Sequence, residues 1–321
     1  MNLTATEIEF KNLSPELLEK AYKNKWFKAF VLNKWGGLEA TLAEGLQIIQ
    51  SCSKLNGSFG WCINLGAGAN YFSGFYSEAG ANKIFSDPKC VLAGSGGLAT
   101  EVKQVEGGFL VSGKWSKATG TDHATYFTCN GKLPSGEAVS LTLDLKDVHV
   151  YKNWNLSGMK SSSSFGFSVN EAFVSNDFVF RINGSNQSVS YGIHQLPFEV
   201  FAQFCMTAAA LGLSDGIIEK LKGELLKPAA EASLETLKVL IEDKSNKLKE
   251  LADRIWGEIQ TKNQFLTTDP IGVLVKETGI ALFNAVNQLY FDAGLLMADE
   301  RKSVHNQYKD FMLAIQHSIF K

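Results

Sequence analysis

The feature that most constrains the fold of this 321-residue chain is a change of hydrophobic period along its length. Residues 13–85 repeat apolar side chains at the spacing of a helix, and residues 89–183 instead alternate apolar and polar positions between glycine-rich turns. From about Gln195 onward the helical spacing returns. Helices, then short strands, then helices predict an α+β fold in which a β-domain lies between two helical portions.

The helical portions carry start signals and apolar stripes. Ser14 followed by Pro15 predicts a helix start, because proline is tolerated in the first turn. Further helices are expected at residues 38–52, 58–75, 201–226, 230–262 and 268–298, and a last one at about 306–320. We therefore divide the chain into an N-terminal helical domain (1–85), a central β-barrel or sandwich domain (86–185) and a C-terminal helical bundle domain (186–321).

Composition excludes several classes of partner. Hydrophobic residues make up 45% and charged residues 20%, as in an ordinary soluble protein. The formal net charge of −2 gives no electrostatic reason to expect nucleic acid or an anionic membrane. Five scattered cysteines without CxxC spacing argue for a reducing compartment and against a metal site or disulfide framework. Without a leader pattern or a long apolar run, we expect a cytoplasmic protein.

The most informative motif is residues 107–124, GGFLVSGKWSKATGTDHA. A Gly-Gly turn opens an alternating strand, and a further glycine, Gly113, precedes small and hydroxyl residues that end in Asp-His. The segment resembles the flavin-facing strand of the acyl-CoA dehydrogenase superfamily. Its ending is closer to one branch, the two-component flavin-dependent monooxygenases. Aligning Gly113 with the family glycine implies that Thr119 is the threonine that contacts the flavin.

Three further segments match the same family in order. Residues 154–164, WNLSGMKSSSS, resemble the family's W…GM[RK]GTGS element, and residues 35–39, WGGLE, resemble its yGGle element. Residues 307–317, QYKDFMLAIQH, resemble the C-terminal helix of the monooxygenase branch. Together the four matches cover most of the chain.

The resemblance implies a flavin, FAD or FMN, held in a dry pocket with hydrogen-bond donors along the ring edge. His317 would be the catalytic base, or would steady the flavin–oxygen adduct, because an imidazole titrates near the working pH. Taken alone, these hydroxyl residues are also ordinary strand-end and turn residues, and His317 is also an ordinary surface histidine. The cofactor-binding residues that the resemblance implies are Ser95, Trp115, Ser116, Thr119, Trp154 and Ser164.

The leading functional prediction is an oxygen-activating monooxygenase that uses reduced flavin on a small aromatic substrate. A separate flavin reductase and a homodimer or homotetramer built on the C-terminal helices are implied partners. An acyl-CoA dehydrogenase is the first alternative, but the family's two positions for its carboxylate base fall on Ser318 and about Ala202, and Glu199 is a weak substitute. The family's ERxxFG element, which holds the FAD pyrophosphate, has no counterpart. A degenerate member kept as a binding or scaffold protein is the second alternative.

Overall fold

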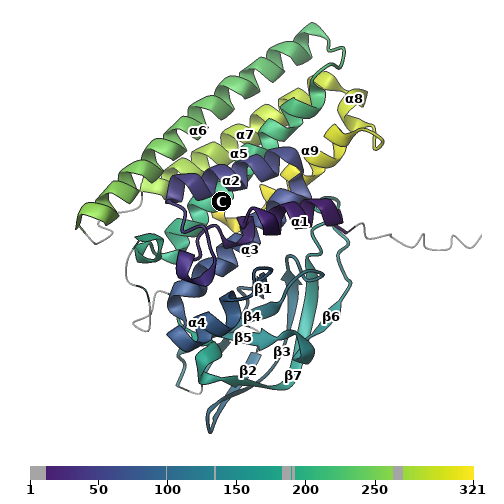
Figure 1. Cartoon of the computed structure of the whole chain (residues 1–321). Helices are drawn as coiled ribbons and strands as arrows, with labels where there is room; N and C mark the ends of the chain where they lie inside the picture. Colours follow the sequence, from purple (N-terminus) through teal and green to yellow (C-terminus); the bar gives the residue numbers. More distant parts are fainter. Residues whose placement is uncertain (1–11, 99, 134, 183–188, 190–191, 263–269) are drawn as a thin grey trace, which may run out of the picture.

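The structure is a computed structural model that describes residues 12–98, 100–133, 135–182, 189, 192–262 and 270–321. In the sequence, helices come before and after the strands. In space, the helices stack above a curved sheet (Figure 1). The α+β class predicted from the change of period is therefore confirmed. The helices before the sheet are α1 (Pro15–Lys23), α2 (Leu42–Leu55), α3 (Gly57–Asn70) and α4 (Glu78–Phe85).

Local capping sets where these helices begin. The Ser14 hydroxyl accepts the N–H of Leu17 at 3.2 Å, and Pro15 occupies the first helical position, as the sequence predicts. Helix α2 begins later than expected because Thr41 and Glu44 form a capping box. The Thr41 hydroxyl accepts the N–H of Glu44, and the Glu44 carboxylate accepts the N–H of Thr41 at 2.9 Å.

The described strands form one eight-stranded sheet in the order β6-β7-β3-β2-β4-β5-β8, and β1 pairs with β4 in parallel. Strand β3 pairs antiparallel with β7, and their last paired residues are Ala118 and Phe165. Thr119, which follows Ala118, and Ser164, which precedes Phe165, are therefore neighbours. The strands are β1 (Leu92–Ser95), β2 (Thr100–Val105), β3 (Gly108–Ala118), β4 (Tyr126–Lys132), β5 (Ala138–Asp144), β6 (His149–Tyr151), β7 (Phe165–Ser175) and β8 (Val179–Phe180).

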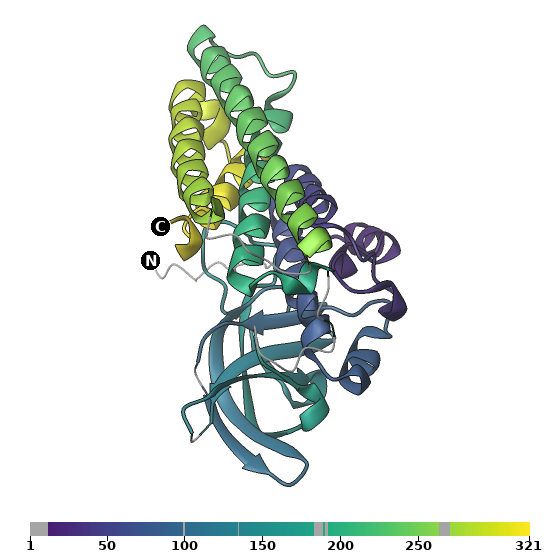
Figure 2. The same ribbon diagram turned by 90° about the vertical axis from the view of Figure 1, so that its left-hand side faces the viewer.

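Helix α5 (Phe198–Leu221) is the central helix of the bundle. It packs against α2, α3, α6 (Pro228–Lys262), α7 (Pro270–Ala293) and α9 (Ser303–Ala314). Of the described helices, it alone is long and apolar enough to cross a membrane, and 83% of its most apolar stretch is buried inside the protein. That burial fits the core helix of a soluble protein. Figure 2 shows the long α6 and α7 extending away from the sheet.

The C-terminal segment differs from the sequence expectation. Helix α9 ends at Ala314, so His317 is not on it, whereas the apolar spacing predicts a helix to about residue 320. His317 has extended backbone angles (φ −60°, ψ 138°) and precedes a short turn, Ser318–Phe320. The larger apolar core runs through the helices and the sheet, and a second, smaller cluster lies around α1 and α3. The division into three domains stays a prediction.

Candidate functional site

A cavity of about 300 Å³ lies between the edge of the sheet and helices α3 and α5. Its apolar wall includes Phe72, Phe198 and Phe201. Its polar side is formed by hydroxyl and amide side chains, from Ser95 at the end of β1, Thr119 just after β3, and Thr128 and Asn130 within β4. A ring system with a polar edge suits such a surface, since small-molecule sites are mostly apolar with a few placed polar groups.

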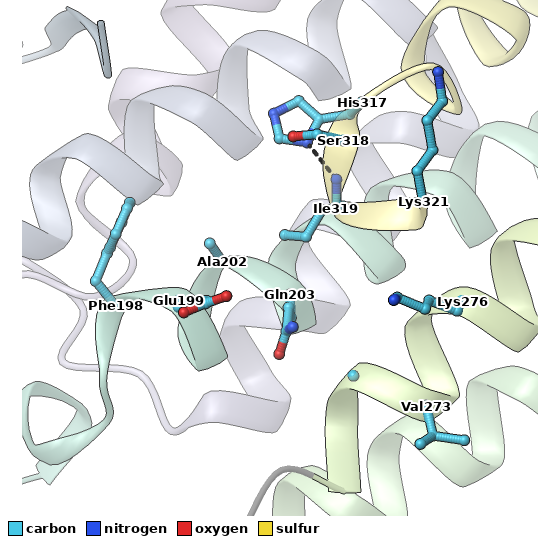
Figure 3. A pocket seen from close by; sticks show the side chains of 11 residues that line it. Phe198, Glu199, Ala202, Gln203, Val273, Lys276, His317, Ser318, Ile319 and Lys321 are labelled. Carbon is cyan, nitrogen blue, oxygen red and sulfur yellow. Dashed lines mark hydrogen bonds between the residues drawn. The ribbon is translucent and has the colours of Figure 1, made fainter. Parts of the chain in front are cut away.

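A wider groove of about 690 Å³ lies outside this cavity (Figure 3). The two share Phe198, Ala202, His317 and Ile319 as lining residues. The outer groove is more polar, because Glu199, Gln203, Lys276 and Lys321 also line it. The shared residues therefore lie where the groove and the inner cavity adjoin.

The structure brings together four of the residues predicted for the site. Ser95, Thr119 and His317 line the inner cavity. The Ser164 hydroxyl lies directly behind Thr119, with 2.9 Å between the two side-chain oxygens. The β3–β7 register explains this contact, because Thr119 follows and Ser164 precedes the last paired residues of the two strands.

The other three predicted residues do not line the cavity. The Trp115 ring stacks on Phe167 at 4.8 Å, and its Nε1 donates to the carbonyl of Gly97 at 3.2 Å. Ser116 is exposed on the surface. The buried Trp154 donates from Nε1 to the carbonyl of Gly158 at 3.0 Å and so braces its own loop. Trp115 and Trp154 have structural contacts here, and a cofactor role for all three remains a prediction.

The tetraserine segment is a tightly held turn. Met159 (φ 53°) and Ser163 (φ 46°) adopt left-handed backbone angles that non-glycine residues rarely use. The Ser162 hydroxyl donates to the carbonyl of Met159 at 2.7 Å and lies 2.7 Å from the Ser164 hydroxyl. The segment is thus fixed, and not the flexible turn that four serines would form on their own.

Asp310 on α9 holds this turn, and Gln307, one helical turn earlier, ties α9 to α2, α3 and α5; the motif alone gave neither residue a role. The buried Asp310 accepts the N–H of Met159 at 2.5 Å through Oδ1 and the hydroxyl of Ser58 at 3.3 Å through Oδ2. Gln307 accepts the N–H of Gly57 at 3.1 Å and donates to the carbonyls of Ser53 and Leu213. Their signal in the sequence is two polar residues spaced i, i+3 on the apolar side of the last helix.

Burial raises the pKa of the Asp310 carboxyl to about 6, although its hydrogen bonds and the charge of Lys220 act in the opposite direction. Because the folded-state pKa lies above the ordinary value of 3.8, the native state holds this proton more tightly than the unfolded chain. The resulting stabilisation is complete below pH 3.8 and is lost as the pH rises through about 6.

We therefore predict that Asp310→Asn changes the pH dependence of stability. The free energy of unfolding of the wild type, relative to Asp310→Asn, should fall by about 2–3 kcal/mol between pH 4 and pH 7.5. Urea denaturation at both pH values measures it. Asp147→Asn, at an exposed position, is the matched control and should show no such change. A pH-independent difference between wild type and Asp310→Asn would contradict the assignment.

His317 is exposed towards the groove, yet the surrounding atoms remove enough water to lower the pKa of its imidazole below the ordinary 6.5. The ring is therefore mostly neutral at pH 7. Its Nδ1 accepts the N–H of Ile319 at 3.3 Å, which leaves the proton of the neutral ring on Nε2 (Figure 3). To accept a proton at Nδ1, His317 must break its hydrogen bond with the N–H of Ile319. That bond is long and exposed, and water can take the place of Nδ1 as its acceptor.

Among the described residues, no three His, Cys, Asp or Glu side chains lie together as a metal site would require. The five cysteines are buried and unpaired. Burial raises the pKa of the Cys205 thiol, which lines the cavity, so it stays protonated and unreactive.

The curated proteins to which the chain is similar are named as hydroxylases or monooxygenases. No family model matches the chain. A pigment production hydroxylase of a Rhodococcus species is 27% identical over 205 residues, which are 59% of this chain and 53% of that protein. The chain thus spans about half the length of the curated relatives it matches. Other matched relatives are named as oxygenase components or subunits of flavin-dependent monooxygenases.

Solved structures cover nearly the whole chain. A 3-HSA hydroxylase from Rhodococcus superposes with a TM-score of 0.85 at 14% identity, over 97% of this chain and 87% of that one. XiaF from Streptomyces, solved with FADH2, superposes with a TM-score of 0.83 at 17% identity, over 97% of this chain and 85% of that one. The chain therefore has the acyl-CoA dehydrogenase-like fold.

Proposed function

We propose that this protein is an oxygenase component that takes up reduced flavin from a separate reductase and hydroxylates a small aromatic molecule. The observation that carries the proposal is the apolar cavity, with Thr119 at its polar side, Ser164 behind Thr119, and His317 where the cavity meets the outer groove. The names of the relatives and the FADH2 bound by one structural neighbour support it. Either FMN or FAD would serve. The proposal places the protein in the cytoplasm.

The residues that line the cavity fit a flavin ring. Gly68 and Gly96 both line it, and a Cβ built on either would have no atom within 4 Å, so the backbone leaves open space there. A ring would contact Phe72 and Phe201, and Ser95, Thr119 and Asn130 would hydrogen-bond its polar edge. When bound, the reduced flavin supplies the electrons that activate oxygen.

The chain's own residues then bind the substrate, exclude water and move a proton. The phenyl rings of the cavity wall keep water out, which such oxidations need. His317, where the cavity meets the groove, would take the proton from a substrate hydroxyl in its neutral form. Substrate would enter through the outer groove.

The dehydrogenase alternative has less support. Among the described residues that line the cavity there is no aspartate or glutamate, and thioester dehydrogenation needs a carboxylate base there. Glu199 lines only the outer groove and is exposed. The scaffold alternative predicts no flavin binding, which the experiment below tests.

The assembly is also part of the proposal. Exposed apolar side chains follow the outer side of α7 and the start of α8 (Leu295–Ala298), and surfaces of this kind mark interfaces. They support a homodimer or homotetramer built on these helices. The exposed side chains are Val273, Ile280, Phe291 and Leu295.

The test is an anaerobic titration of the purified protein with reduced FMN and reduced FAD, followed by oxygen and p-hydroxyphenylacetate, whose phenol hydroxyl His317 could deprotonate, with product analysis. We expect saturable binding and hydroxylated product. Binding of oxidised FAD together with its bleaching by an acyl-CoA would favour the dehydrogenase. Absence of binding to any flavin would favour the scaffold.

Gly68→Leu tests whether the flavin binds in the inner cavity. The leucine side chain would extend into the open cavity, so we expect flavin affinity to fall about tenfold or more. The fold should be at least as stable, because leucine favours helix over glycine by about 0.8 kcal/mol. Gly257→Leu, at an exposed position of α6 with equally open space, is the matched control and should leave binding unchanged. Unaltered affinity in Gly68→Leu would place the flavin elsewhere.

A further inference from the structure

Among the described residues that line the inner cavity, Met206 is the only methionine. Helix α5 presents Phe198, Ala202, Cys205 and Met206 to the cavity, because residues at this spacing share one side of a helix. The Met206 side chain is buried from the bulk solvent, with 6% of its surface exposed. Its thioether therefore belongs to the wall of the site and not to the surface of the protein.

A buried amide holds the sulfur of Met206. Asn64 on α3 also lines the cavity, is 2% exposed, and donates from Nδ2 to Sδ of Met206 at 3.2 Å. A thioether is only a weak acceptor, whereas the oxygen of a sulfoxide is a polar acceptor. Because methionine has three rotatable bonds, the same N–H can donate to an oxygen atom added to the sulfur. The wall can thus accommodate the oxidised form of Met206.

The other groups in this wall resist oxidation. In the part of the chain that the structure describes, no tyrosine or tryptophan lines the cavity. The second sulfur is that of Cys205, and burial raises the pKa of its thiol, so the reactive thiolate does not form. A thioether needs to lose no proton before it reacts. Met206 is therefore the most readily oxidised group of the wall.

We propose that Met206 is a self-oxidation site, at which the protein transfers an oxygen atom to its own thioether when no substrate is bound. The inference rests on the proposed function, in which dioxygen and reduced flavin react in this cavity. One oxygen atom of dioxygen bonds to Sδ through a sulfur lone pair, and the O–O bond breaks. The other oxygen atom leaves as water, with two protons and two electrons from the reduced flavin. The sulfur and the flavin are oxidised, and dioxygen is reduced.

Oxidation of Met206 acts as a brake on turnover that consumes reduced flavin without substrate. The sulfoxide replaces an apolar part of the cavity wall by a polar group, which should weaken flavin binding about tenfold or more. A bound substrate protects Met206, because it takes the oxygen atom instead. Methionine sulfoxide can be reduced enzymatically, so the brake is reversible.

The test follows the oxygen atom by its isotope. Reduced FMN is added repeatedly to the protein under isotopically heavy dioxygen, without substrate, and catalase removes peroxide from the bulk solution. Peptide mass spectrometry then measures the heavy-oxygen sulfoxide at each methionine. We expect it at Met206 and little of it at Met312, a half-buried methionine of α9 outside the cavity that reports bulk peroxide.

Two leucine variants connect the modification to binding. Leucine at position 206 has a similar volume and cannot form a sulfoxide. Met206→Leu should therefore keep, after the same treatment, the FMN affinity that it had before it. Met297→Leu, at a fully buried position outside the cavity, is the matched control and should lose affinity about tenfold, as the wild type does. Thermal denaturation confirms that both variants are folded.

Three results would contradict the inference. Heavy-oxygen sulfoxide at Met206 that disappears on addition of catalase, or that only equals the amount at Met312, would assign the oxidation to bulk peroxide. Binding of reduced FMN and hydroxylated product without heavy oxygen at Met206 would overturn the inference and leave the proposed function standing. Failure to bind reduced FMN would overturn both.

Discussion

Replacing His317 with alanine should lower the hydroxylation rate about 100-fold, with little effect on stability. A positioned base contributes about 10²–10⁴ to a rate, and the side chain is exposed and holds only the N–H of Ile319. In the wild type the rate should fall with decreasing pH through a value below 6.5, because desolvation lowers the pKa of the imidazole and only the neutral ring can accept a proton. Single-turnover rates between pH 5 and 8 measure both effects.

His317→Gln separates proton transfer from hydrogen-bond donation. The carboxamide can donate a hydrogen bond, as Nε2–H does in the tautomer set by Ile319, but it cannot remove a proton at these pH values. If His317 is a base, the glutamine variant should be as slow as the alanine variant. A glutamine variant that keeps most of the wild-type rate would instead mean that donation from Nε2 is what matters.

Gly158→Ala should destabilise the protein by about 3 kcal/mol and abolish flavin binding. A Cβ at this position would lie 2.3 Å from the carbonyl oxygen of Lys309 and 2.7 Å from its carbon, so the turn and helix α9 would have to separate. Separation would break the 2.5 Å hydrogen bond between Met159 and Asp310. The turn would then lose its anchor, and with it the contact of Ser164 with Thr119. Urea denaturation and FMN titration measure the two losses.

Gly97→Ala is the control for that substitution. This glycine is also in a loop, but an exposed one, and a Cβ there would make only ordinary contacts, at 3.7 and 3.9 Å. Its free energy of unfolding should stay within about 0.5 kcal/mol of the wild type. A Gly158→Ala protein as stable as Gly97→Ala would show that α9 can shift without loss.

Much of the fold was predictable because local signals determine it. Ser14 and Pro15 begin α1 where the sequence places the start, since a cap and its helix are neighbours in the chain. The last helix was predicted too long, because its apolar spacing continues past Ala314 although the backbone leaves the helix at His317. Spacing alone does not reveal where a chain turns.

The site was predictable in part. Motif order identified Ser95, Thr119 and His317, which line one cavity, and Ser164 behind it. It did not distinguish them from Trp115 and Trp154, whose indole N–H groups bond backbone carbonyls. Which way a side chain faces depends on strand register and loop conformation, and a motif records neither.

The sequence by itself determined the order of helices and strands and the residue types available to the candidate site. The tertiary structure decided which of these residues meet. Thr119 and Ser164 are 45 positions apart and Met159 and Asp310 are 151 apart, and only the packed sheet and α9 bring each pair into contact. The hydrogen bonds of the candidate site depend on those contacts, because a side chain gains its partner only when the elements that carry both are packed together.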